Sequence, residues 1–587
     1  MGYRETTEAG GIRQDYGNAR GIGIFYPAHL ARVSGISRIY GLAYIDEGWL
    51  ETERGVGKVE VKFGNDSRTA RLYVKNRYFV RTFDSARFKD GELEVTATAW
   101  DMEGSLIGSV SQTIIIDNNG KTAVHQERKF ASPGGSENGN GSIDSPWDIK
   151  TALDKMEPGT VLILRGGTYE EQTVIKTGGK ANAPSVIINY EDEKVELKGF
   201  GIEIADGTSN LILSGIDQHG TRLNNYGINI GTDIERVSVW DCSFNDNTHP
   251  YESLPHQPQT EYGTGFYASV IRSRADRSRI RRYLEVSHCM ACGNDVDGFL
   301  LSSIAYGRFQ FLESCYTPDT RKPEKRKDIF QYKHANGFAA DNSEYRWNGY
   351  ASVDNVYMFC YSHHNGQDGW DIRTPHTRLF GCVTHDEAFV GIPFGGEGIK
   401  FWEYDYHISN CVTFRNNIVD GTGDAFMLAV DVPEPKYESY RRKNAFIHNT
   451  AFYHAEVDAI NLSEGAHEIY VENCVIQKAR RAITIDIAEK CMGYIRRCIF
   501  FNVKDGTVAE QDEPLSERIF ESHIADPGFA DPERGNFFPK KGSLMLTAGN
   551  THGLLFDVDG IDYSVLDGLG RPRASKTEAG PYTRYEE

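Results

Sequence analysis

One short pattern recurs along most of the chain, and it constrains the fold more than any other feature. Eight of the ten cysteines follow a brief β-rich run and precede a small or apolar residue: VWDCSF, VSHCMA, LESCYT, MFCYSH, FGCVTH, SNCVTF, ENCVIQ and RRCIFF. One residue type in one local context indicates one structural slot that is filled repeatedly, as in a repeat fold. We interpret these cysteines as stacked, buried thiols, because neighbours in such a stack seldom have the offset that a disulfide requires.

The spacing of the slot gives the length of the repeat. Cys360 and Cys382 are 22 residues apart. Cys474 and Cys498 are 24 residues apart, and Thr450 in IHNTAF fills the slot before Cys474. A period in the twenties with insertions is expected for a coil of three short parallel strands per turn. A chain of 587 residues is too long for one ordinary core, so a repeat architecture also accounts for its length.

A second pattern runs in phase with the cysteines. Six segments begin with an acid or amide, continue with Gly or Ala and a large apolar residue, and vary at the fourth position: DGFLLS from Asp297, NGFAAD from Asn336, DGWDIR from Asp368, EGIKFW from Glu397, DAFMLA from Asp424 and DAINLS from Asp458. Alternate residues of a strand share a face, so the apolar third positions are predicted to face the coil interior and the fourth positions to face solvent. Successive coils then bring Asp371 and Lys400 to roughly 4.8 Å from each other.

Two explanations compete for this polar cluster. Asp and Asn at turns commonly accept hydrogen bonds from backbone N–H groups, and this is our interpretation of Asp297, Asp424 and Asp458. Asp371 differs because it lies in mid-strand, where Asp is disfavoured. Its pairing with Lys400 is either a surface ion pair worth under ~1 kcal/mol or part of a functional site. We favour the site.

The segment SPWDIKTALDKMEPGTVLILRGGTYEE predicts a helix over residues 145–157 that caps the coil. Ser145 is the expected N-cap, Pro146 suits the first helical position, and Asp148 completes a pattern like a capping box. The apolar residues that follow have helical spacing, and Pro158-Gly159 ends the helix. Such a helix would plug the open apolar end of a parallel coil.

The cap, the strand PGTVLILRGGTY and the coil segments, over about residues 130–540, resemble the right-handed parallel β-helix polysaccharide lyases. The segments NGFAAD, NGQDGWDIR and GEGIKFW resemble family 9, the pectate lyases that use calcium and a lysine base. The resemblance implies an all-β fold, Ca²⁺ as cofactor and an acidic, pectate-like polysaccharide as substrate. It puts Asn336, Gln367, Asp368 and Asp371 on calcium-ligand positions and Lys400 on the position of the base.

The chain departs from the family pattern at two of these positions. Asn336 and Gln367 stand where the pattern has Asp, which removes two negative charges. Amide oxygens still ligate calcium, but the affinity should fall unless Glu397 compensates as a further ligand.

Elimination from a uronan suits these residue types. The C5 proton beside a carboxylate is a weak acid, and a cation bound to that carboxylate makes the proton more acidic. A lysine close to a divalent cation has a lowered pKa and so becomes a usable base. Arg373, His363, His364 and Arg378 are near in sequence, and we interpret them either as ligands of substrate carboxylates or as solvated surface groups.

The rest of the chain divides into three parts. Residues 1–120 alternate short strands with Gly, Asp and Asn turns, which predicts an immunoglobulin-like β-sandwich with an accessory role. Residues 121–144 are dense in Gly, Ser and Asn and predict a linker. Residues 145–545 then form the catalytic β-helix, and residues 546–587 form a polar, irregular tail.

Charge and hydropathy exclude some partners. The formal net charge of −19 argues against nucleic acid, and it means that local positive charge or a bound cation must hold an acidic polysaccharide. No apolar run approaches the ~20 residues that span a bilayer, so no membrane insertion is expected. The N-terminal text MGYRETTEAGG lacks the apolar core of a signal peptide, so we expect a mature extracellular or surface protein, acting as a monomer.

Two other functions stay open on the sequence alone. A β-helix glycoside hydrolase would use paired aspartates, which Asp368 and Asp371 allow, although no GHG-type histidine strand is present. A non-catalytic, carbohydrate-binding adhesin would use the acidic ladder only for structure. Formation of an unsaturated product distinguishes a lyase from both.

Overall fold

The computed structural model describes most of the chain. The described residues are 13–17, 20–45, 48–50, 55–119, 125–221, 226–248, 263–269, 280–316, 335–340, 353–388, 396–402, 405–416, 424–429, 444–506, 508–510, 519–550, 556–558 and 561–585. In this part of the chain, no helix is long and apolar enough to cross a membrane.

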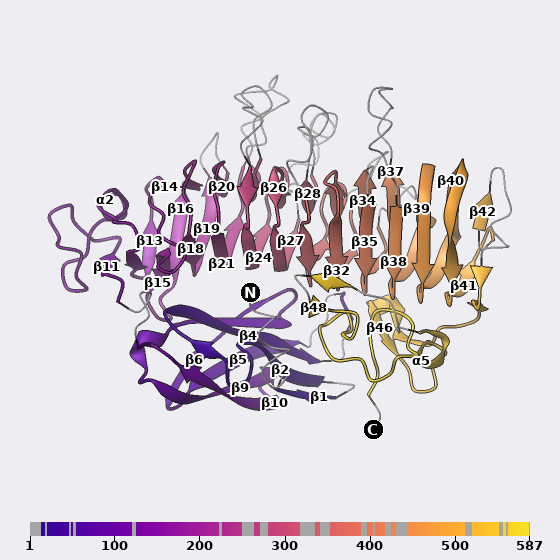
Figure 1. Cartoon of the computed structure of the whole chain (residues 1–587), viewed down its shortest axis with the longest axis horizontal. Coiled ribbons are helices and arrows are strands. Elements are labelled where there is room, and N and C mark those ends of the chain that lie inside the picture. Colours follow the sequence, from indigo (N-terminus) through magenta and orange to yellow (C-terminus); the bar gives the residue numbers. More distant parts are fainter. Residues whose placement is uncertain are drawn as a thin grey trace, which may run out of the picture.

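Nearly all strands from β11 (Arg128–Ala131) to β44 (His523–Ile524) make one continuous stack along the molecule (Figure 1). Each strand pairs in parallel with the equivalent strand of the next coil, as β12 (Val161–Leu164) does with β15 (Ser185–Asn189). The fold is therefore a right-handed parallel β-helix, as predicted. The stack begins inside the range that the sequence predicts to be a linker, because β11 pairs with β12 along its whole length.

Three columns of strands surround the interior near the predicted site. The site sheet contains β25 (Phe299–Leu301), β28 (Phe338–Ala340), β31 (Trp370–Ile372), β34 (Ile399–Trp402) and β37 (Phe426–Ala429). The second sheet contains β29 (Val356–Met358), β32 (Thr377–Phe380), β35 (Asp405–Ser409) and β38 (Asn444–His448). The third sheet contains β30 (Tyr361–His363), β33 (Val383–His385) and β36 (Val412–Phe414).

The interior is filled by the positions that the sequence pattern assigns to it. The apolar third positions Phe299, Phe338, Trp370, Ile399 and Phe426 are at most 1% exposed and belong to one core cluster. The rings of Phe299, Phe338 and Trp370 stack from coil to coil, with the Phe338 and Trp370 centroids 4.8 Å apart. This inward packing fixes the register, since a shift by one residue would turn every side chain to the other face.

The cysteine slot is confirmed for seven cysteines, which are buried free thiols: Cys242, Cys289, Cys360, Cys382, Cys411, Cys474 and Cys498. Thr450 occupies the same slot, because it lies before Ala451, which pairs with Val412 and Val475. The assignment of Cys315 to the slot is wrong. The register of β24 (Glu285–Cys292) and β27 (Arg308–Cys315) pairs Cys289 with Leu312, so Leu312 fills the slot.

The same register pairs Cys292 with Cys315, and the two form a disulfide. The expectation of free thiols throughout therefore fails at this pair. The two cysteines are directly opposite each other on adjacent coils, where a bond is possible. The tenth cysteine, Cys491, lies outside the residues whose side chains are described.

The predicted cap exists but is shorter. Helix α2 spans Ile149–Asp154, and its N-cap is Asp148, whose side chain accepts a hydrogen bond from Thr151 N at 2.8 Å. Ser145 is not the cap, because Trp147 still forms a parallel bridge with Ala131 and delays the helix. Ile149 and Ala152 are buried against the first coil, as expected of a plug.

Two five-stranded sheets form the N-terminal part. The first sheet orders β1 (Arg13–Tyr16), β2 (Arg20–Tyr26), β4 (Ile36–Ile45), β8 (Tyr78–Asp84) and β7 (Arg71–Tyr73). The second orders β3 (Arg32–Val33), β10 (Leu106–Ile116), β9 (Gly91–Asp101), β5 (Val56–Phe63) and β6 (Asp66–Thr69). Apolar residues of both sheets share one core, so this part is a sandwich. Its immunoglobulin-like character stays a prediction.

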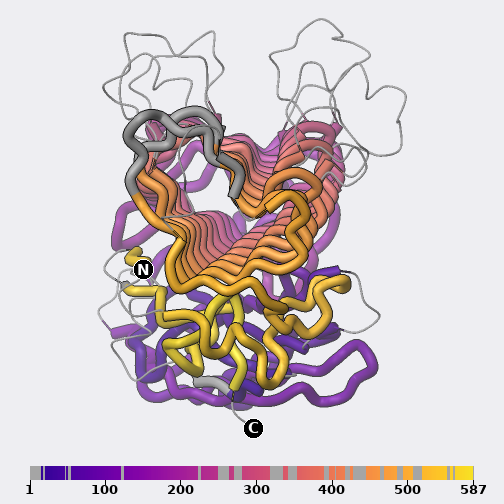
Figure 2. The backbone as a smooth tube through the Cα atoms, turned by 90° about the vertical axis from the view of Figure 1, so that its right-hand side faces the viewer, coloured from indigo at the N-terminus to yellow at the C-terminus, as the bar shows by residue number. Residues whose placement is uncertain are grey.

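The sandwich lies along the side of the coil (Figures 1 and 2). Phe25 and Tyr78 of the sandwich pack against Phe311 of the coil, with the Tyr78 and Phe311 ring centroids 4.7 Å apart. These residues belong to one apolar cluster with the outer faces of the second and third sheets. The sandwich therefore covers the side of the coil away from the site sheet.

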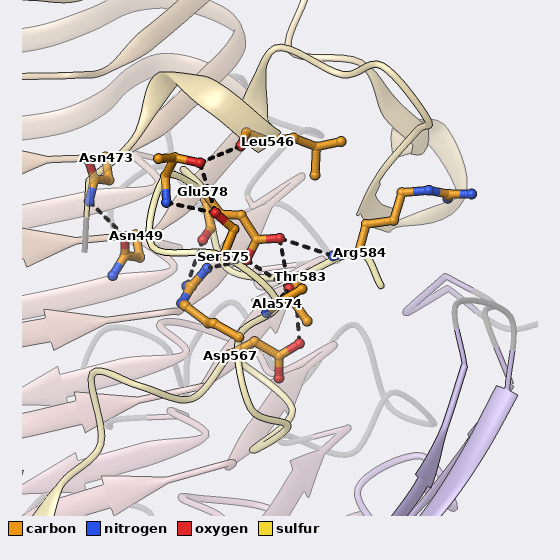
Figure 3. Close-up of polar contacts among 12 residues, drawn as sticks. Asn449, Asn473, Leu546, Asp567, Ala574, Ser575, Glu578, Thr583 and Arg584 are labelled. Carbon is orange, nitrogen blue, oxygen red and sulfur yellow. Dashed lines mark hydrogen bonds and ion pairs between the residues drawn. The ribbon is translucent and has the colours of Figure 1, made fainter. Parts of the chain in front are cut away.

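The C-terminal segment packs on the same side as the sandwich, beyond helix α5 (Met545–Ala548) (Figures 1 and 2). The sequence predicts an irregular tail here, but polar contacts hold it in place (Figure 3). Arg571 is fully buried and donates to Asp567 Oδ2 from Nε at 2.9 Å and from Nη2 at 2.7 Å. Thr583 donates to the buried Glu578 at 2.7 Å. A buried arginine paired in this way is stable only in a packed setting.

Candidate active site

The site sheet brings Asp371 and Lys400 together on its outer face. Asp371 in β31 pairs with Lys400 in β34, and both follow Ala339 of β28 in the same outward row. The Asp of DGWDIR and the Lys of EGIKFW thus occupy the equivalent fourth positions on successive coils. This part of the sequence prediction is confirmed by the register.

The fourth positions are less accessible than predicted. Leu300 and Ala339 are 3% and 5% exposed, and Asp371 is 6% exposed. The Lys400 side chain is 13% exposed. They point away from the coil interior, yet they are not open to solvent. Leu300 and Ala339 instead form a small apolar cluster with Tyr226 and Tyr267 on the outer face.

First-position side chains form a ladder of hydrogen bonds along the edge of the site sheet. Asp297 Oδ1 accepts from Asn336 N at 2.9 Å, and Asn336 Oδ1 accepts from Asp368 N at 3.1 Å. Asp424 Oδ1 accepts from Asp458 N at 3.0 Å. The structural interpretation of Asp297 and Asp424 is therefore confirmed. Asp458 differs, because its carboxylate accepts two hydrogen bonds from the Arg481 side chain, at 2.5 and 2.9 Å.

The two carboxylate oxygens of Asp368 have different surroundings. One oxygen accepts backbone hydrogen bonds, as in the ladder, and the other does not. Its Oδ1 accepts from Gly396 N at 2.7 Å and from Glu397 N at 3.0 Å. Its Oδ2 is buried and has no hydrogen-bond partner among the described residues. Burial and the nearby charge of Glu397 raise the pKa of Asp368 well above its usual range. A buried carboxylate oxygen without a donor is costly unless a cation lies nearby.

The Lys400 ammonium is a cation close to this oxygen. Its Nζ lies 3.7 Å from Asp368 Oδ2 and 3.4 Å from Glu397 Oε2. Burial lowers the pKa of Lys400, but the charges of Asp368, Glu397 and Asp371 outweigh it, so the net pKa is raised. Lys400 is therefore held as an ammonium among three carboxylates.

Trp402 joins this cluster, and our sequence reasoning did not select it. Its Nε1–H donates to Asp371 Oδ1 at 2.6 Å, and its ring lies under the Arg373 guanidinium at 4.2 Å. The Lys400 ammonium is 5.3 Å from the same ring. The strand period gives the missed signal, because Trp402 is two residues after Lys400 and so shares its outward face.

The other predicted site residues divide into two groups. Arg373 belongs to the cluster, because its guanidinium packs on the Trp402 ring. Gln367 is half-buried in the turn before Asp368, and its backbone N–H donates to Ala335 O. His363 and His364 lie at the end of the third sheet, where His363 Nε2 is 3.4 Å from Glu313 Oε1. Arg378 lies on the second sheet and donates to Asp557 O of the C-terminal segment. We do not retain these three as substrate ligands, since they project from other sheets.

Comparison with known proteins gives a partial match. No family model matches the chain. Over 317 residues the chain is 23% identical to pectate lyase L of Thermoclostridium stercorarium, in an alignment that covers 50% of this chain and 21% of that protein. The chain is similar to pectate lyases. Over 73 residues, 12% of its length, it is 40% identical to pectate lyase PEL9 of Emericella nidulans, of which 18% is covered. The chain spans about a fifth of the length of these relatives.

Solved structures resemble the chain in outline. Pectate lyase Pel9A aligns with 78% of this chain and 96% of its own, at 12% identity and a TM-score of 0.43. XylC in complex with xylose aligns with 78% of this chain and 98% of its own, at 10% identity and a TM-score of 0.42. Structural similarities with TM-scores this low carry no functional argument. The function is therefore argued from the site residues and from the sequence relatives.

Proposed function

We propose that this protein is a polysaccharide lyase that cleaves a pectate-like uronic-acid polymer by β-elimination, with Lys400 as the base. The observation that carries the proposal is the pairing of Lys400 with Asp371 on adjacent strands, with Asp368 and Glu397 in reach of the same ammonium. The similarity to pectate lyases supports the same reaction class. A polymeric substrate of this kind also implies that the protein acts outside the cell.

Calcium fits the oxygen donors of this cluster. No described residue donates a hydrogen bond to the buried Asp368 Oδ2, and Glu397 and Asp371 add two further carboxylates. Calcium prefers carboxylate oxygens, so these three residues would hold it. Asn336 contributes less than the resemblance implies, since its Oδ1 already accepts from Asp368 N. Glu397 supplies a charge that Asn336 and Gln367 lack.

Bound calcium would neutralise a substrate carboxylate and so make the C5 proton more acidic. Lys400 Nζ accepts that proton, which requires that the amine be uncharged when substrate is bound. The surrounding carboxylates oppose this state, because they raise the pKa of Lys400. Compensation of their charge by a divalent cation reverses this effect. The base and the cation site therefore depend on each other.

Arg373 and Trp402 provide positive charge and a flat surface beside Lys400. The guanidinium rests on the indole ring at 4.2 Å, which holds the arginine in one orientation. A guanidinium held in this way binds a carboxylate with two parallel hydrogen bonds. We assign to Arg373 the binding of a substrate carboxylate, and to Trp402 the orientation of both Arg373 and Asp371.

The test is an assay with polygalacturonate, followed by ultraviolet absorbance of the unsaturated product and by release of reducing ends. We expect both signals to rise together in calcium and both to disappear in excess chelator. Reducing ends without the unsaturated product would identify a hydrolase and overturn the proposal. Binding without cleavage, across a set of uronic-acid polymers, would identify a non-catalytic adhesin.

A further inference from the structure

A cluster of histidines at the end of the third sheet is not used by the proposed reaction. The strands β30 and β33 pair His363 with His385, and the residues that follow them are His364 and Asp386. Both following residues have positive φ, 55° at His364 and 52° at Asp386. The same turn therefore occurs on two successive coils. It places the pair His363 and His364 next to the pair His385 and Asp386, at the spacing of neighbouring strands.

The imidazoles of His363 and His385 each turn one nitrogen toward a partner outside the cluster and the other toward a neighbour within it. His363 directs Nε2 to Glu313 Oε1 at 3.4 Å, and its Nδ1 lies 3.0 Å from His364 Nδ1. His385 directs Nε2 to the Tyr361 hydroxyl at 2.6 Å, and its Nδ1 lies 2.8 Å from Asp386 Oδ2. Metal-binding histidines typically have such an outer partner on the nitrogen that does not bind the metal.

The ligand atoms of three of these residues are close enough to share one ion. Ligand atoms of His364, His385 and Asp386 all lie within 4.8 Å of one another. The Nδ1 atoms of His363 and His364 are 3.0 Å apart, somewhat less than the roughly 3.3–3.4 Å between two nitrogens that each lie about 2.0–2.1 Å from a tetrahedral zinc ion. Arg415 lies 3.1 Å from Asp386 Oδ1, which leaves Oδ2 on the side of the histidines.

We propose that His363, His364, His385 and Asp386 form a binding site for a divalent transition-metal ion, with zinc as the expected occupant. Three imidazoles and one carboxylate are donors that zinc prefers and that calcium does not. The site is separate from the Lys400 cluster, because its strands belong to the third sheet. Cys315 lies next to it but is bonded to Cys292, so it offers no thiolate.

The surroundings indicate a structural role for the ion. Tyr361, the outer partner of His385, also donates to Trp49 O at 3.1 Å, and Glu313, the outer partner of His363, accepts from Lys75 N at 3.0 Å. Trp49 and Lys75 belong to the N-terminal part. An ion that holds His363 and His385 would therefore also fix the groups through which the coil contacts that part.

Cobalt(II) titration of the full chain, dialysed first against chelator, tests the site. We expect one equivalent to bind with visible ligand-field bands, to be displaced by zinc and to resist excess calcium. His364→Ala should weaken binding roughly tenfold or more. His376→Ala is the matched control, since that histidine is 51% exposed and outside the cluster, and it should bind as the wild type does.

A second variant guards against misfolding as the cause of a loss. Asp386→Asn keeps the size of the side chain and should also weaken cobalt binding, with an unchanged circular dichroism spectrum. Zinc should raise the melting temperature of the wild type but not of His364→Ala. Absence of stoichiometric cobalt binding to the wild type, or equal binding to the wild type, His364→Ala and Asp386→Asn, would overturn the proposal.

Discussion

Lys400 is the proposed base, but the carboxylates around it favour its charged form. Its Nζ lies within 3.4–3.7 Å of two carboxylates, and these charges raise its pKa. In the proposed reaction, the amine would keep its proton at neutral pH without a divalent cation, and the elimination would stop. The dependence of the base on the cation can therefore be measured directly.

We predict that the pH at which kcat/KM reaches half its maximum falls as the calcium concentration rises. The carboxylates raise the pKa of Lys400, so a bound cation that compensates their charge lowers it, and activity then appears at lower pH. The measurement is a set of pH–rate profiles at increasing calcium. A midpoint that does not move with calcium would contradict the coupling.

Trp402 supports a second prediction at this scale. Trp402→Phe keeps an aromatic ring under Arg373 but removes the hydrogen bond to Asp371 Oδ1. We expect activity to fall roughly 10- to 100-fold, in line with a lost charge-assisted hydrogen bond of about 1.5–3 kcal/mol. Trp100→Phe, in the sandwich, is the control and should leave activity unchanged. An unaltered rate in Trp402→Phe would remove Trp402 from the site.

Glu387 makes the stability of the coil depend on pH. It is buried between the coils and accepts hydrogen bonds from Ser362 Oγ at 2.6 Å and Asn365 N at 2.9 Å. Burial raises its pKa from 4.5 to about 8, so the folded protein keeps the proton to higher pH than the unfolded chain does. The stabilisation is full below about pH 4.5 and is lost as pH rises to about 8.

We therefore predict that the free energy of unfolding falls between about pH 5 and 8, by at most roughly 5 kcal/mol. Glu387→Gln, which cannot ionise, should flatten the curve over this interval. Urea unfolding at several pH values is the measurement. An equal pH dependence in the wild type and in Glu387→Gln would show that another group is responsible.

At the scale of elements, the sequence predicts the coil well because each strand repeats the same inward positions. Phe338, Trp370 and Ile399 could be assigned to the interior from alternation alone, and the register then brings Asp371 beside Lys400. Two local features could not be predicted from this alternation. Leu312 replaces a cysteine in the slot, and β27 runs on for three residues to Cys315, which has the same flanking text as a slot cysteine.

The disulfide gives a prediction at this scale. Titration of thiols in denaturant should find two more reactive groups after reduction than before it, because only Cys292 and Cys315 of the described cysteines are bonded. The Cys315→Ser variant should abolish the difference, whereas Cys382→Ser should not. Equal counts before and after reduction of the wild type would contradict the assignment.

At the scale of the whole molecule, the sequence predicts the parts but not their arrangement. The sandwich and the C-terminal segment both pack on the outer faces of the second and third sheets, through contacts such as those of Phe25 and Tyr78 with Phe311. These residues are hundreds of positions apart, and no period relates them. The same arrangement explains why His363, His364 and Arg378 are near Lys400 in sequence but belong to the covered side.

We predict that Phe311→Ala destabilises the protein by about 3–5 kcal/mol, because it opens a cavity between the sandwich and the coil. Phe311 is 1% exposed and contacts five aromatic rings from both parts. Phe520→Ala is the matched control, since Phe520 is 50% exposed. Equal unfolding curves for the two variants would show that the interface contributes little to stability.

The most direct measurement of the central claim is the rate at which Lys400→Arg forms the unsaturated product from polygalacturonate in saturating calcium. Arginine keeps the charge but does not lose its proton in the working range, so we expect a loss of roughly 10²-fold or more in turnover. Calcium affinity and stability should change little, and Lys198→Arg, at an exposed lysine, should act as the wild type does. Turnover by Lys400→Arg close to that of the wild type would contradict the claim that Lys400 is the base.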